Sequence, residues 1–482
     1  MLVKTYGCAL EGVDALTITV EVNISGGLPA FAIVGLPDNA VRESRERVEA
    51  ALRNTGFEYP RGRVTINMAP ADVRKEGSAY DLGIAIGLLA AGGQMDHDRL
   101  KDYLIMGELS LDGTLRPIRG ALPIAIEARK KGFKGFILPE ENAREAAIVD
   151  NLDVIPIREI TEAIAYLNGA NNVQPANVDT RLLFEDAQAN FEMDFQDVRG
   201  QENVKRALEV AAAGGHNVLM IGPPGAGKTM LAKRMPTILP PMTLREALET
   251  TKFHSVAGIL DDSEGLVAHR PFRSPHHTVS DVALVGGGVN PKPGEISLAH
   301  HGVLFLDELP EFKRSVLEVM RQPLEDRRII ISRARLTVEY PASFMLIASM
   351  NPTPSGHWDS GQRESFYDTA ASSKYLAKIS GPLLDRIDMH IEITPVPFEE
   401  LSAERTGEPS RDIKQRVVAA RERQHKRFEG NKKVYNNAMM PPPMVRELCK
   451  INKASETLLK TAMERLDLSA RAYDRILKVA RT

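Results

Sequence analysis

The chain has 482 residues, 43% hydrophobic and 26% charged, a composition typical of soluble globular proteins with two or three domains. Its net charge of -3 excludes a uniformly basic surface, so any contact with nucleic acid must come from a local basic patch. Cys8 and Cys449 are too few and too far apart for a disulfide framework or a zinc spacing. No apolar run is long enough to cross a membrane, and the first residues lack a signal-peptide core. We therefore expect a cytoplasmic enzyme with no membrane partner.

The first 168 residues show the pattern of a mixed α/β domain. Alternating or continuous apolar residues predict strands at Ala15–Val22, Phe31–Leu36, Arg63–Met68, Leu104–Leu109 and Phe136–Leu138. Helical spacing predicts helices over Asn39–Asn54 and Tyr80–Ala91.

Two segments of this region resemble the proteolytic domain of Lon-type proteases. Arg74–Tyr80 is similar to the loop that carries their serine, and Leu115–Leu122 is similar to the segment that leads to their lysine. By motif register the serine position falls on Ala79 and the lysine position on Leu122, so both members of the dyad are absent.

Ser78 and Lys75 lie within the loop Arg74–Tyr80, but neither occupies the matching position. A Ser–Lys protease needs a hydroxyl and a neutral amine within hydrogen-bond reach of each other. We therefore expect a folded module that serves oligomerisation or partner binding rather than proteolysis.

The segment Asn168–Val178 is rich in Asn, Gly and Pro and has no periodicity, which predicts a domain boundary. The expected organisation is a Lon-like domain over 1–168, a linker over 169–190, an ATPase core over 191–397 and a helical lid over 398–482.

Residues Val218–Thr229 carry the clearest motif of the chain. An apolar run typical of a buried strand leads into a glycine-rich turn, and a helical pattern follows from Met230. The turn consists of Gly222, Pro223, Pro224, Gly225, Ala226, Gly227, Lys228 and Thr229. Its glycines let backbone N–H groups converge on a polyphosphate, Lys228 can reach the β- and γ-phosphates, and Thr229 can ligate Mg²⁺. The motif predicts a site for ATP and Mg²⁺ at a helix N-terminus.

Two acids follow a second apolar run, Gly302–Leu306. Asp307 and Glu308 stand at the carboxyl end of this predicted strand, where open α/β sheets bind ligands. In P-loop enzymes the aspartate supports Mg²⁺ and the adjacent glutamate polarises the attacking water. We predict that both residues are catalytic.

Two further polar residues are candidates for the same site. Phe344–Met350 is typical of a buried strand and ends at Asn351, which we expect to touch the γ-phosphate or orient the water; an Asn–Pro turn is the alternative. Arg386 is expected to act as an arginine finger on the ATP of a neighbouring subunit, which requires a ring of subunits. The alternative for Arg386 is a surface salt bridge with Asp385 or Asp388.

Two basic stretches are candidate DNA surfaces. Arg327–Tyr340 predicts a hairpin with Arg333 and Arg335 near its tip, where they could follow a phosphate backbone. Arg411–Phe428 predicts a basic helix. Solvated charges are the alternative for both.

Taken together, these motifs resemble the magnesium-chelatase-like AAA+ family. The match is sharpened by the intervening segments Arg270–His277, Gly286–Gly288, Pro293–Ala299 and Asp307–Phe312. With the Lon-like domain in front, nearly the whole chain resembles the competence-protein branch of this family. The resemblance implies an α/β fold: an AAA+ P-loop ATPase with a helical lid, preceded by a Lon-protease-like (ribosomal S5 domain 2-like) α/β domain.

The resemblance also implies a function. Members of this branch are expected to be hexameric ATP-driven DNA helicases that migrate branched DNA during natural transformation, with single-stranded or branched DNA and recombination proteins as partners. The resemblance places Asp194–Gln201 where AAA+ enzymes contact adenine. It also places Arg471 at the position of the lid arginine that reaches the γ-phosphate of its own subunit. The helical pattern continues up to Thr482, so we expect an incomplete lid.

A structural zinc is not expected. Family members often carry a cysteine cluster after the strand that ends at Asn351, and residues 351–357 contain no cysteine. The pairs His276–His277 and His300–His301 are adjacent in sequence, so in extended backbone their side chains would point to opposite faces. We expect them to be structural residues rather than metal ligands.

Two other functions stay open. A magnesium-chelatase motor subunit would use the same ATPase to drive metal insertion into a porphyrin, but such subunits are expected to resemble only the residues from about 190 onward. An ATP-regulated scaffold or protease relative is the third reading, and the missing dyad argues against its protease version.

Overall fold

The computed structural model describes residues 1–170, 173–188, 193–261, 265–288, 291–333, 336–352, 375, 377–397, 407–431 and 433–482. The described chain forms two units, one of residues 1–186 and 247–267 and one of residues 187–246 and 268–482. The segment 247–267 therefore belongs to the first unit, although in sequence it lies between the P-loop and Asp307.

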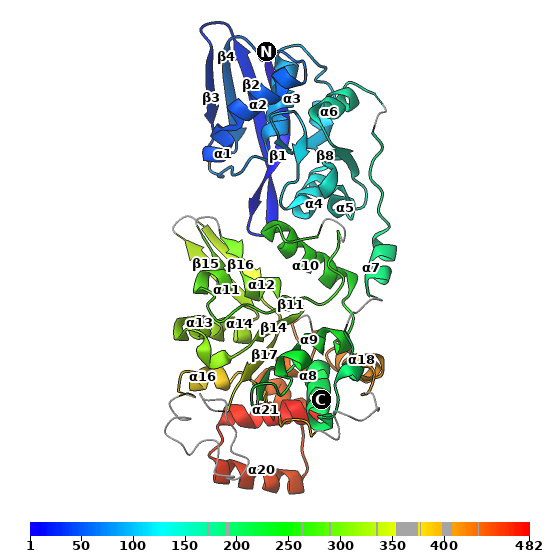
Figure 1. Cartoon of the computed structure of the whole chain (residues 1–482), viewed down its shortest axis with the longest axis vertical. Helices are drawn as coiled ribbons and strands as arrows, with labels where there is room; N and C mark the ends of the chain where they lie inside the picture. Colours follow the sequence, from blue (N-terminus) through cyan, green and yellow to red (C-terminus); the bar gives the residue numbers. More distant parts are fainter. Residues whose placement is uncertain are drawn as a thin grey trace. The chain divides into compact units, whose positions relative to one another are not determined.

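The first unit is built on a seven-stranded mixed sheet (Figure 1). Across the sheet its strands run in the order β3 (Ala30–Val34), β4 (Arg63–Ala69), β2 (Asp14–Ser25), β1 (Leu2–Glu11), β5 (Tyr103–Ile105), β8 (Gly135–Pro139) and β9 (Asp153–Ile157). β1, β2 and β4 pair antiparallel, whereas β3 pairs parallel with β4 and β1, β5, β8 and β9 pair parallel in turn. A separate short ladder joins β6 (Glu108–Leu109) to β7 (Leu115–Arg116).

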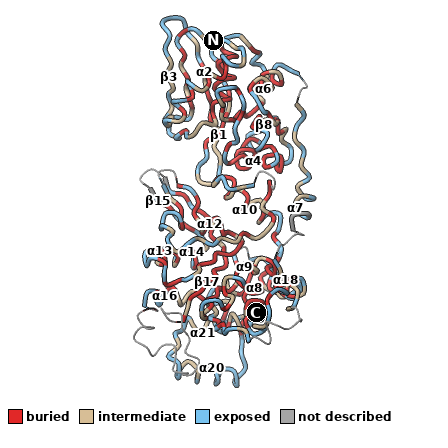
Figure 2. Tube along the Cα trace, in the orientation of Figure 1, coloured by how far each residue is buried: buried red, intermediate tan, exposed pale blue. Residues whose placement is uncertain are grey.

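Helices cover this sheet and supply its core. They are α1 (Asn39–Arg42), α2 (Ser44–Asn54), α3 (Asp81–Ala91), α4 (Ala121–Lys131), α5 (Ala143–Ala146) and α6 (Ile160–Leu167), with 3₁₀ turns at Leu100–Asp102 and Glu140–Asn142; α7 (Thr180–Gln188) follows along the chain. Every residue of α3 is buried, and the helix packs on β1 and β2; Figure 2 shows how the buried residues gather in this part of the chain. After Asp81, whose carboxylate pairs with Arg47, its small and aliphatic side chains carry no polar group that needs a partner.

The second unit contains a five-stranded parallel sheet. Its strands run in the order β11 (Phe272–Arg273), β14 (Val303–Leu306), β17 (Met345–Met350), β10 (Val218–Ile221) and β18 (Met389–Glu392). All parallel strands end at the same edge, so the residues that follow β10, β14 and β17 are neighbours in space. Two smaller ladders join β12 (Gly286–Gly287) to β13 (Lys292–Pro293) and β15 (Arg328–Arg333) to β16 (Leu336–Pro341).

Short and medium-length helices complete this unit. They are α8 (Glu202–Gly214), α9 (Lys228–Ile238), α10 (Leu244–Ala257, which continues into the first unit), α11 (Asp281–Val285), α12 (Glu295–Leu298), α13 (Arg314–Val319), α14 (Arg321–Asp326), α16 (Gly381–Leu384), α18 (Ser410–Arg427), α19 (Pro442–Leu448), α20 (Lys453–Leu466) and α21 (Ala470–Arg481), with 3₁₀ turns at Phe195–Asp197, Leu309–Glu311 and Asn437–Met439. α8, α9 and α18 pack together over the sheet, and their apolar side chains share one core with those of its strands.

Most predicted elements of the first unit are present, with shifted ends. The helix expected over Asn39–Asn54 is divided at Glu43 into α1 and α2. The strand expected over Leu104–Leu109 is also divided, because Met106 N bonds the carbonyl of Ile137 while Gly107 N bonds that of Ala79, which turns the chain away from the sheet. β1 and β9 were not predicted.

The boundaries at 168, 190 and 397 remain predictions. Within the expected linker 169–190, Ala176 pairs with Val154 and α7 follows. None of the described helices combines the length and the apolar run that a membrane crossing requires.

Candidate functional site

The glycine-rich turn leaves β10 and enters α9 at Lys228. Gly225 and Gly227 have φ angles of +77° and +89°, which side-chain-bearing residues rarely adopt. A Cβ at Gly222 would lie 2.4 Å from the carbonyl oxygen of Ile393, just after β18, so this position has no room for a side chain. The turn therefore keeps the compact form in which backbone N–H groups and a helix N-terminus face the same space.

Lys228 is held on the inner side of this turn. Its Nζ donates hydrogen bonds to the carbonyl of Gly222 (2.7 Å), the carbonyl of Pro223 (2.9 Å) and Oδ1 of Asn351 (3.0 Å). Burial lowers the pKa of the amine, while the negative charges of Asp307 and Glu308 oppose that shift. Lys228 thus joins the end of β10 to the end of β17, as the adjacency of these strands allows.

Thr229 and Asp307 meet at the carboxyl edge of the sheet. The Thr229 hydroxyl donates to Oδ2 of Asp307 at 2.8 Å, and the hydroxyl of Ser349 bonds Oδ1 of the same carboxylate. Hydroxyl and carboxylate oxygens are the ligands that Mg²⁺ prefers, together with substrate phosphates. The residues present fit a magnesium ion beside a bound triphosphate.

Glu308 turns its backbone sharply after Asp307. Its φ and ψ angles are +53° and +52°, an uncommon conformation for a residue with a side chain, and its N–H lies 3.1 Å from Oδ1 of Asp307. Its carboxylate is more than half exposed and lies 3.9 Å from Nδ1 of His277. Strain of this kind is concentrated at functional sites, and here it separates the directions of two consecutive acids.

Gln201 connects the glycine-rich turn to the segment that follows β18. Its Nε2 donates to the carbonyls of Ala226 (2.9 Å) and Thr394 (3.2 Å). Asp194, at the start of the segment expected to contact adenine, accepts hydrogen bonds from Gln196 N and Ser410 N, both at 2.8 Å. The segment Asp194–Gln201 thus braces the turn and α18, and its contact with adenine remains a prediction.

The structure places Arg386 beside an acid that the sequence did not indicate. Its Nη2 forms an ion pair with Glu325, and its Nη1 donates to the carbonyl of Pro382 at 2.7 Å. The alternative partners Asp385 and Asp388 were wrong, because each has other partners: Asp385 faces Arg471 and Arg475, and Asp388 faces His216.

Arg471 lies on α21 with its guanidinium mostly exposed, 3.9 Å from Asp385. Its neighbour Arg475 is less exposed, and its Nη1 donates to the carbonyls of Leu384 (3.1 Å) and Ile387 (2.7 Å). The structure therefore joins Lys228, Thr229, Asp307 and Asn351 in one group, while Arg386 and Arg471 contact other residues of the same unit.

Of the two candidate DNA surfaces, the hairpin is present as β15 and β16. Arg333 ends β15, and its side chain and the whole of Arg335 lie outside the described residues. The basic stretch 411–428 forms α18, whose arginines are partly engaged within the unit.

Two arginines of α18 show this engagement. Arg416 pairs with Glu209 and Glu408, and Arg421 donates to the carbonyls of Ala212 and Ala213. The partners of Arg416 raise its pKa, whereas burial lowers the pKa of Arg421 to about 10. These contacts favour a structural role for that face of the helix.

Two polar residues of the loop that resembles the Lon-type serine loop form hydrogen bonds within the first unit. The amine of Lys75 is buried and bonds the carbonyls of Pro70 and Val73, and burial lowers its pKa. The hydroxyl of Ser78 bonds Glu108. Leu122, at the lysine position, is fully buried.

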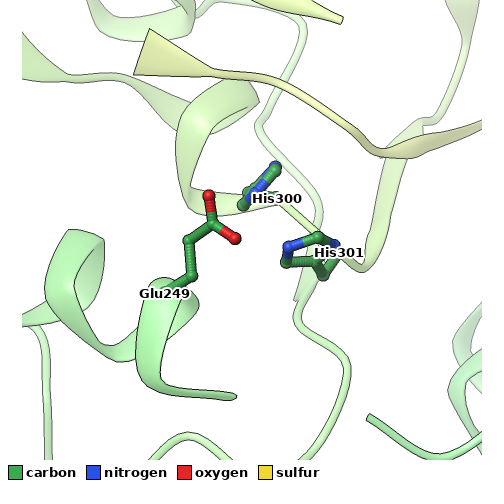
Figure 3. Close-up of side chains that lie close together, drawn as sticks. All are labelled: Glu249, His300 and His301. Carbon is green, nitrogen blue, oxygen red and sulfur yellow. The ribbon is translucent and has the colours of Figure 1, made fainter. Parts of the chain in front are cut away.

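The expectation that paired histidines point to opposite faces was wrong. The ring centroids of His276 and His277 lie 4.0 Å apart with their planes tilted by 35°. Those of His300 and His301 lie 3.8 Å apart with a tilt of 44°, so the rings of each pair are neighbours; Figure 3 shows the second pair. The reason is local: the backbone is not extended here, and His301 has a φ of +60°. The expected absence of zinc concerns residues 351–357, most of which lie outside the described residues.

The contacts of three residues were not predicted. Ser349, Gln201 and His277 contact Asp307, the glycine-rich turn and Glu308 respectively. Ser349 is the one polar residue within β17, a pattern that could have marked it. Gln201 lies in the segment expected to contact adenine and His277 was expected to be structural, and their contacts depend on where their loops return to the sheet.

Comparisons with known proteins place this geometry in a family. The family model described as "Magnesium chelatase, subunit ChlI" matches residues 194–401, "Subunit ChlI of Mg-chelatase" matches 20–142, and "Magnesium chelatase, subunit ChlI C-terminal" matches 407–482. The second match overturns the expectation that chelatase motor subunits resemble only the residues from about 190 onward.

Individual relatives agree with these matches. The chain is 44% identical over 488 residues to "Competence protein ComM" of Haemophilus influenzae, covering 100% of this chain and 93% of the relative. It is 45% identical over 479 residues to "Uncharacterized protein YifB" of Escherichia coli, covering 98% and 91%. A shorter match, 30% identical over 189 residues, joins 33% of this chain to "Lon protease 2" of Bacillus subtilis.

Proposed function

Because the chain belongs to the magnesium chelatase subunit ChlI family of AAA+ ATPases, we propose that it is a hexameric, ATP-driven motor that moves branch points along DNA during recombination and natural transformation. Family membership implies ATP hydrolysis with Mg²⁺. The DNA substrate, the hexamer and the helicase activity are the parts that this proposal adds.

The observation that carries the proposal is the meeting of Lys228, Thr229, Asp307 and Asn351 at one edge of the parallel sheet. Lys228 would release its present acceptors and bind the β- and γ-phosphates. Thr229 and Asp307 would hold Mg²⁺, which neutralises charge on the transferring phosphoryl group when bound. Glu308, whose carboxylate is partly exposed, would orient the attacking water.

Arg386 would complete this site from a neighbouring subunit. An arginine finger stabilises the charge that develops on the phosphates in the transition state. In the single chain Arg386 is occupied by Glu325, so the proposal requires that this ion pair opens when subunits assemble.

Two observations support DNA as the substrate. The relative from Haemophilus influenzae, which matches over the full length of the chain, is named a competence protein. The β15–β16 hairpin precedes β17 and carries basic residues up to Arg333, and basic side chains on a projecting element can follow a phosphate backbone.

The test compares ATP hydrolysis with and without forked or Holliday-junction DNA and then measures strand displacement. Replacing Arg333 and Arg335 together with Ala should abolish DNA stimulation and spare basal turnover. Arg328→Ala is the matched control, since Arg328 lies on the same hairpin and faces Glu339. Stimulation that survives the double substitution would remove the hairpin from the proposal.

Nucleotide chemistry is tested by two other substitutions. Lys228→Ala should lose ATP binding, whereas Arg386→Ala should bind ATP and lose hydrolysis. Normal hydrolysis by Arg386→Ala would contradict a site shared between subunits.

The second candidate function is a chelatase-type motor that remodels a protein partner for metal insertion. It is favoured by the match of residues 20–142 to a model described as a chelatase subunit. Absence of both DNA stimulation and strand displacement would favour this function over the DNA motor.

A further inference from the structure

The edge strand β3 leaves one side of its backbone open. Within the described residues it pairs with β4 on one side and with no strand on the other. Ala30 N donates to Gly62 O at the β4 side, and the N–H and C=O groups of a strand alternate in direction. The N–H and C=O groups of Phe31 and Ile33 therefore point to the open edge.

This edge lacks the charged side chains that usually protect one. Residues 26–37 contain no charged side chain, and Leu28, Val34 and Leu36 in this stretch are 89%, 48% and 50% exposed. Exposed edges are often blocked by charged side chains, because unpaired strand groups are a template for another strand. β3 has 5 residues, about the average length of a strand, and the prolines at 29 and 37 lie outside it. An open apolar edge indicates a surface that a partner covers.

A groove begins at the first residues of β3 and has a cavity volume of about 590 Å³. We call it the β3 groove. Its arginines come from α2 and the loop before β4, and its aromatic rings come from β3 and that loop: Arg45, Arg53, Arg61, Phe31, Phe57 and Tyr59. Apolar rings with basic heads around them suit a ligand that carries both aromatic and acidic groups.

The charges of the groove are partly uncompensated. Arg53 pairs with Glu49 at 2.6 Å, and the guanidinium of Arg45 lies 5.7 Å from the ring centroid of Phe31. Among the described residues, neither Arg45 nor Arg61 has a carboxylate oxygen within ion-pair distance. Two guanidinium groups are thus available to carboxylates of a ligand.

We propose that the open edge of β3 and the β3 groove together bind an extended acidic segment of a partner protein by strand addition. The main chain of the segment would pair with Phe31 and Ile33, and alternate side chains would enter the groove, since residues two apart on a strand share a face. Carboxylates would bind Arg45 and Arg61, and an aromatic side chain would pack on the rings of Phe57 and Tyr59. Nucleic acid fits less well, because its backbone has no alternating N–H and C=O groups that could pair with a strand edge.

The test uses the full-length protein and a fluorescein-labelled peptide of about twelve residues that repeats Asp-Asp-Phe-Phe, so that each face of the extended peptide carries both aspartate and phenylalanine. A peptide with lysine in place of aspartate and an oligothymidylate of about twelve nucleotides are the competing probes. Fluorescence anisotropy should show preferential binding of the acidic peptide, and hydrogen–deuterium exchange should slow at the amides of β3. Preferential binding of the oligothymidylate, or no change in exchange at β3, would overturn the proposal.

Charge reversal locates the site. Arg61→Glu should weaken binding of the acidic peptide by about tenfold or more, since it replaces a charge-assisted hydrogen bond by repulsion. Arg63→Glu is the matched control, because Arg63 is exposed on β4 and does not line the groove. Basal ATP hydrolysis reports that both variants are folded. Equal binding by the two variants, or a change in subunit assembly caused by Arg61→Glu without peptide, would refute a peptide site here.

Discussion

The contact between Lys228 and Asn351 makes a testable claim about how the nucleotide enters the site. The ammonium group of Lys228 donates to three acceptors, and the side-chain carbonyl of Asn351 is the one side-chain acceptor of the three. A phosphate must replace these acceptors. The strength with which residue 351 holds Lys228 therefore enters directly into the affinity for ATP.

Asn351→Asp strengthens this hold. A carboxylate 3.0 Å from the ammonium nitrogen replaces a neutral amide. With an effective dielectric constant of about 20, two unit charges at about 3 Å attract each other by about 5 kcal/mol. Desolvation offsets much of this attraction, and hydrogen bonds between charged groups contribute about 1.5–3 kcal/mol net. We expect ATP affinity to fall by about ten- to a hundredfold, and repulsion between the carboxylate and the γ-phosphate acts in the same direction.

Asn351→Ala is the matched control. It removes the acceptor but leaves Lys228 its two carbonyl partners, so ATP affinity should change by less than about threefold. Hydrolysis should fall if Asn351 orients the attacking water. The assay measures the Kd of a fluorescent ATP analogue with Mg²⁺ and the hydrolysis rate on the same samples, with thermal melting as the folding control. Wild-type affinity in Asn351→Asp would refute the claim that residue 351 restrains Lys228.

Three further predictions concern groups outside this contact. Glu325→Gln should leave ATP affinity unchanged and raise hydrolysis per subunit, because it releases Arg386 for a neighbouring site; a lower melting temperature with unchanged hydrolysis would identify the pair as purely structural. Tyr59→Phe should leave stability unchanged or raise it by about 1 kcal/mol in thermal or urea unfolding, since the hydroxyl is buried without a hydrogen-bond partner among the residues that the structure describes and burial raises its pKa to about 12. A clear loss of stability would show that this hydroxyl has a partner. Affinity for ADP with Mg²⁺ should decrease as pH rises from 7.5 toward the lowered pKa of Lys228, because the phosphate binds the charged amine and burial makes the proton leave below its usual range near 10.4. Constant affinity up to pH 10 would contradict the lowered pKa.

The sequence predicted the parts of the site that follow strands directly. An apolar run that ends in a polar residue marks the carboxyl end of a buried strand, and β10, β14 and β17 all end in this way. Because these strands are parallel and adjacent, Lys228, Asp307 and Asn351 had to be neighbours once the strand order was known. The apolar run and the polar residue at its end were sufficient to predict these strands, because each strand is buried on both faces.

Other contacts could not be read from the chain. Gln201 and His277 reach the site from loops whose paths depend on tertiary packing. The close approach of the rings of adjacent histidines depends on a backbone that leaves the extended region. β1 was missed although it lies near the middle of its sheet. Only part of one of its faces is apolar, because Val3 and Ala9 share that face with Gly7 and with a buried Thr5 whose hydroxyl bonds the carbonyl of Gly83.

For Arg386 and Arg471, alignment with a family motif did not predict the contacts that the side chains make. Register placed Arg386 and Arg471 by analogy with enzymes that hold a nucleotide, whereas the structure shows each facing an acid of its own unit: Glu325 for Arg386 and Asp385 for Arg471. Surface ion pairs of this kind contribute about 0–1 kcal/mol, so they are easily exchanged for a triphosphate that carries several negative charges. Exchange costs little for the exposed Arg471. For Arg386, which is less exposed, both the ion pair with Glu325 and the hydrogen bond to the carbonyl of Pro382 must open. If hydrolysis depends on both arginines, we therefore expect the release of Arg386 to be the slower of the two exchanges.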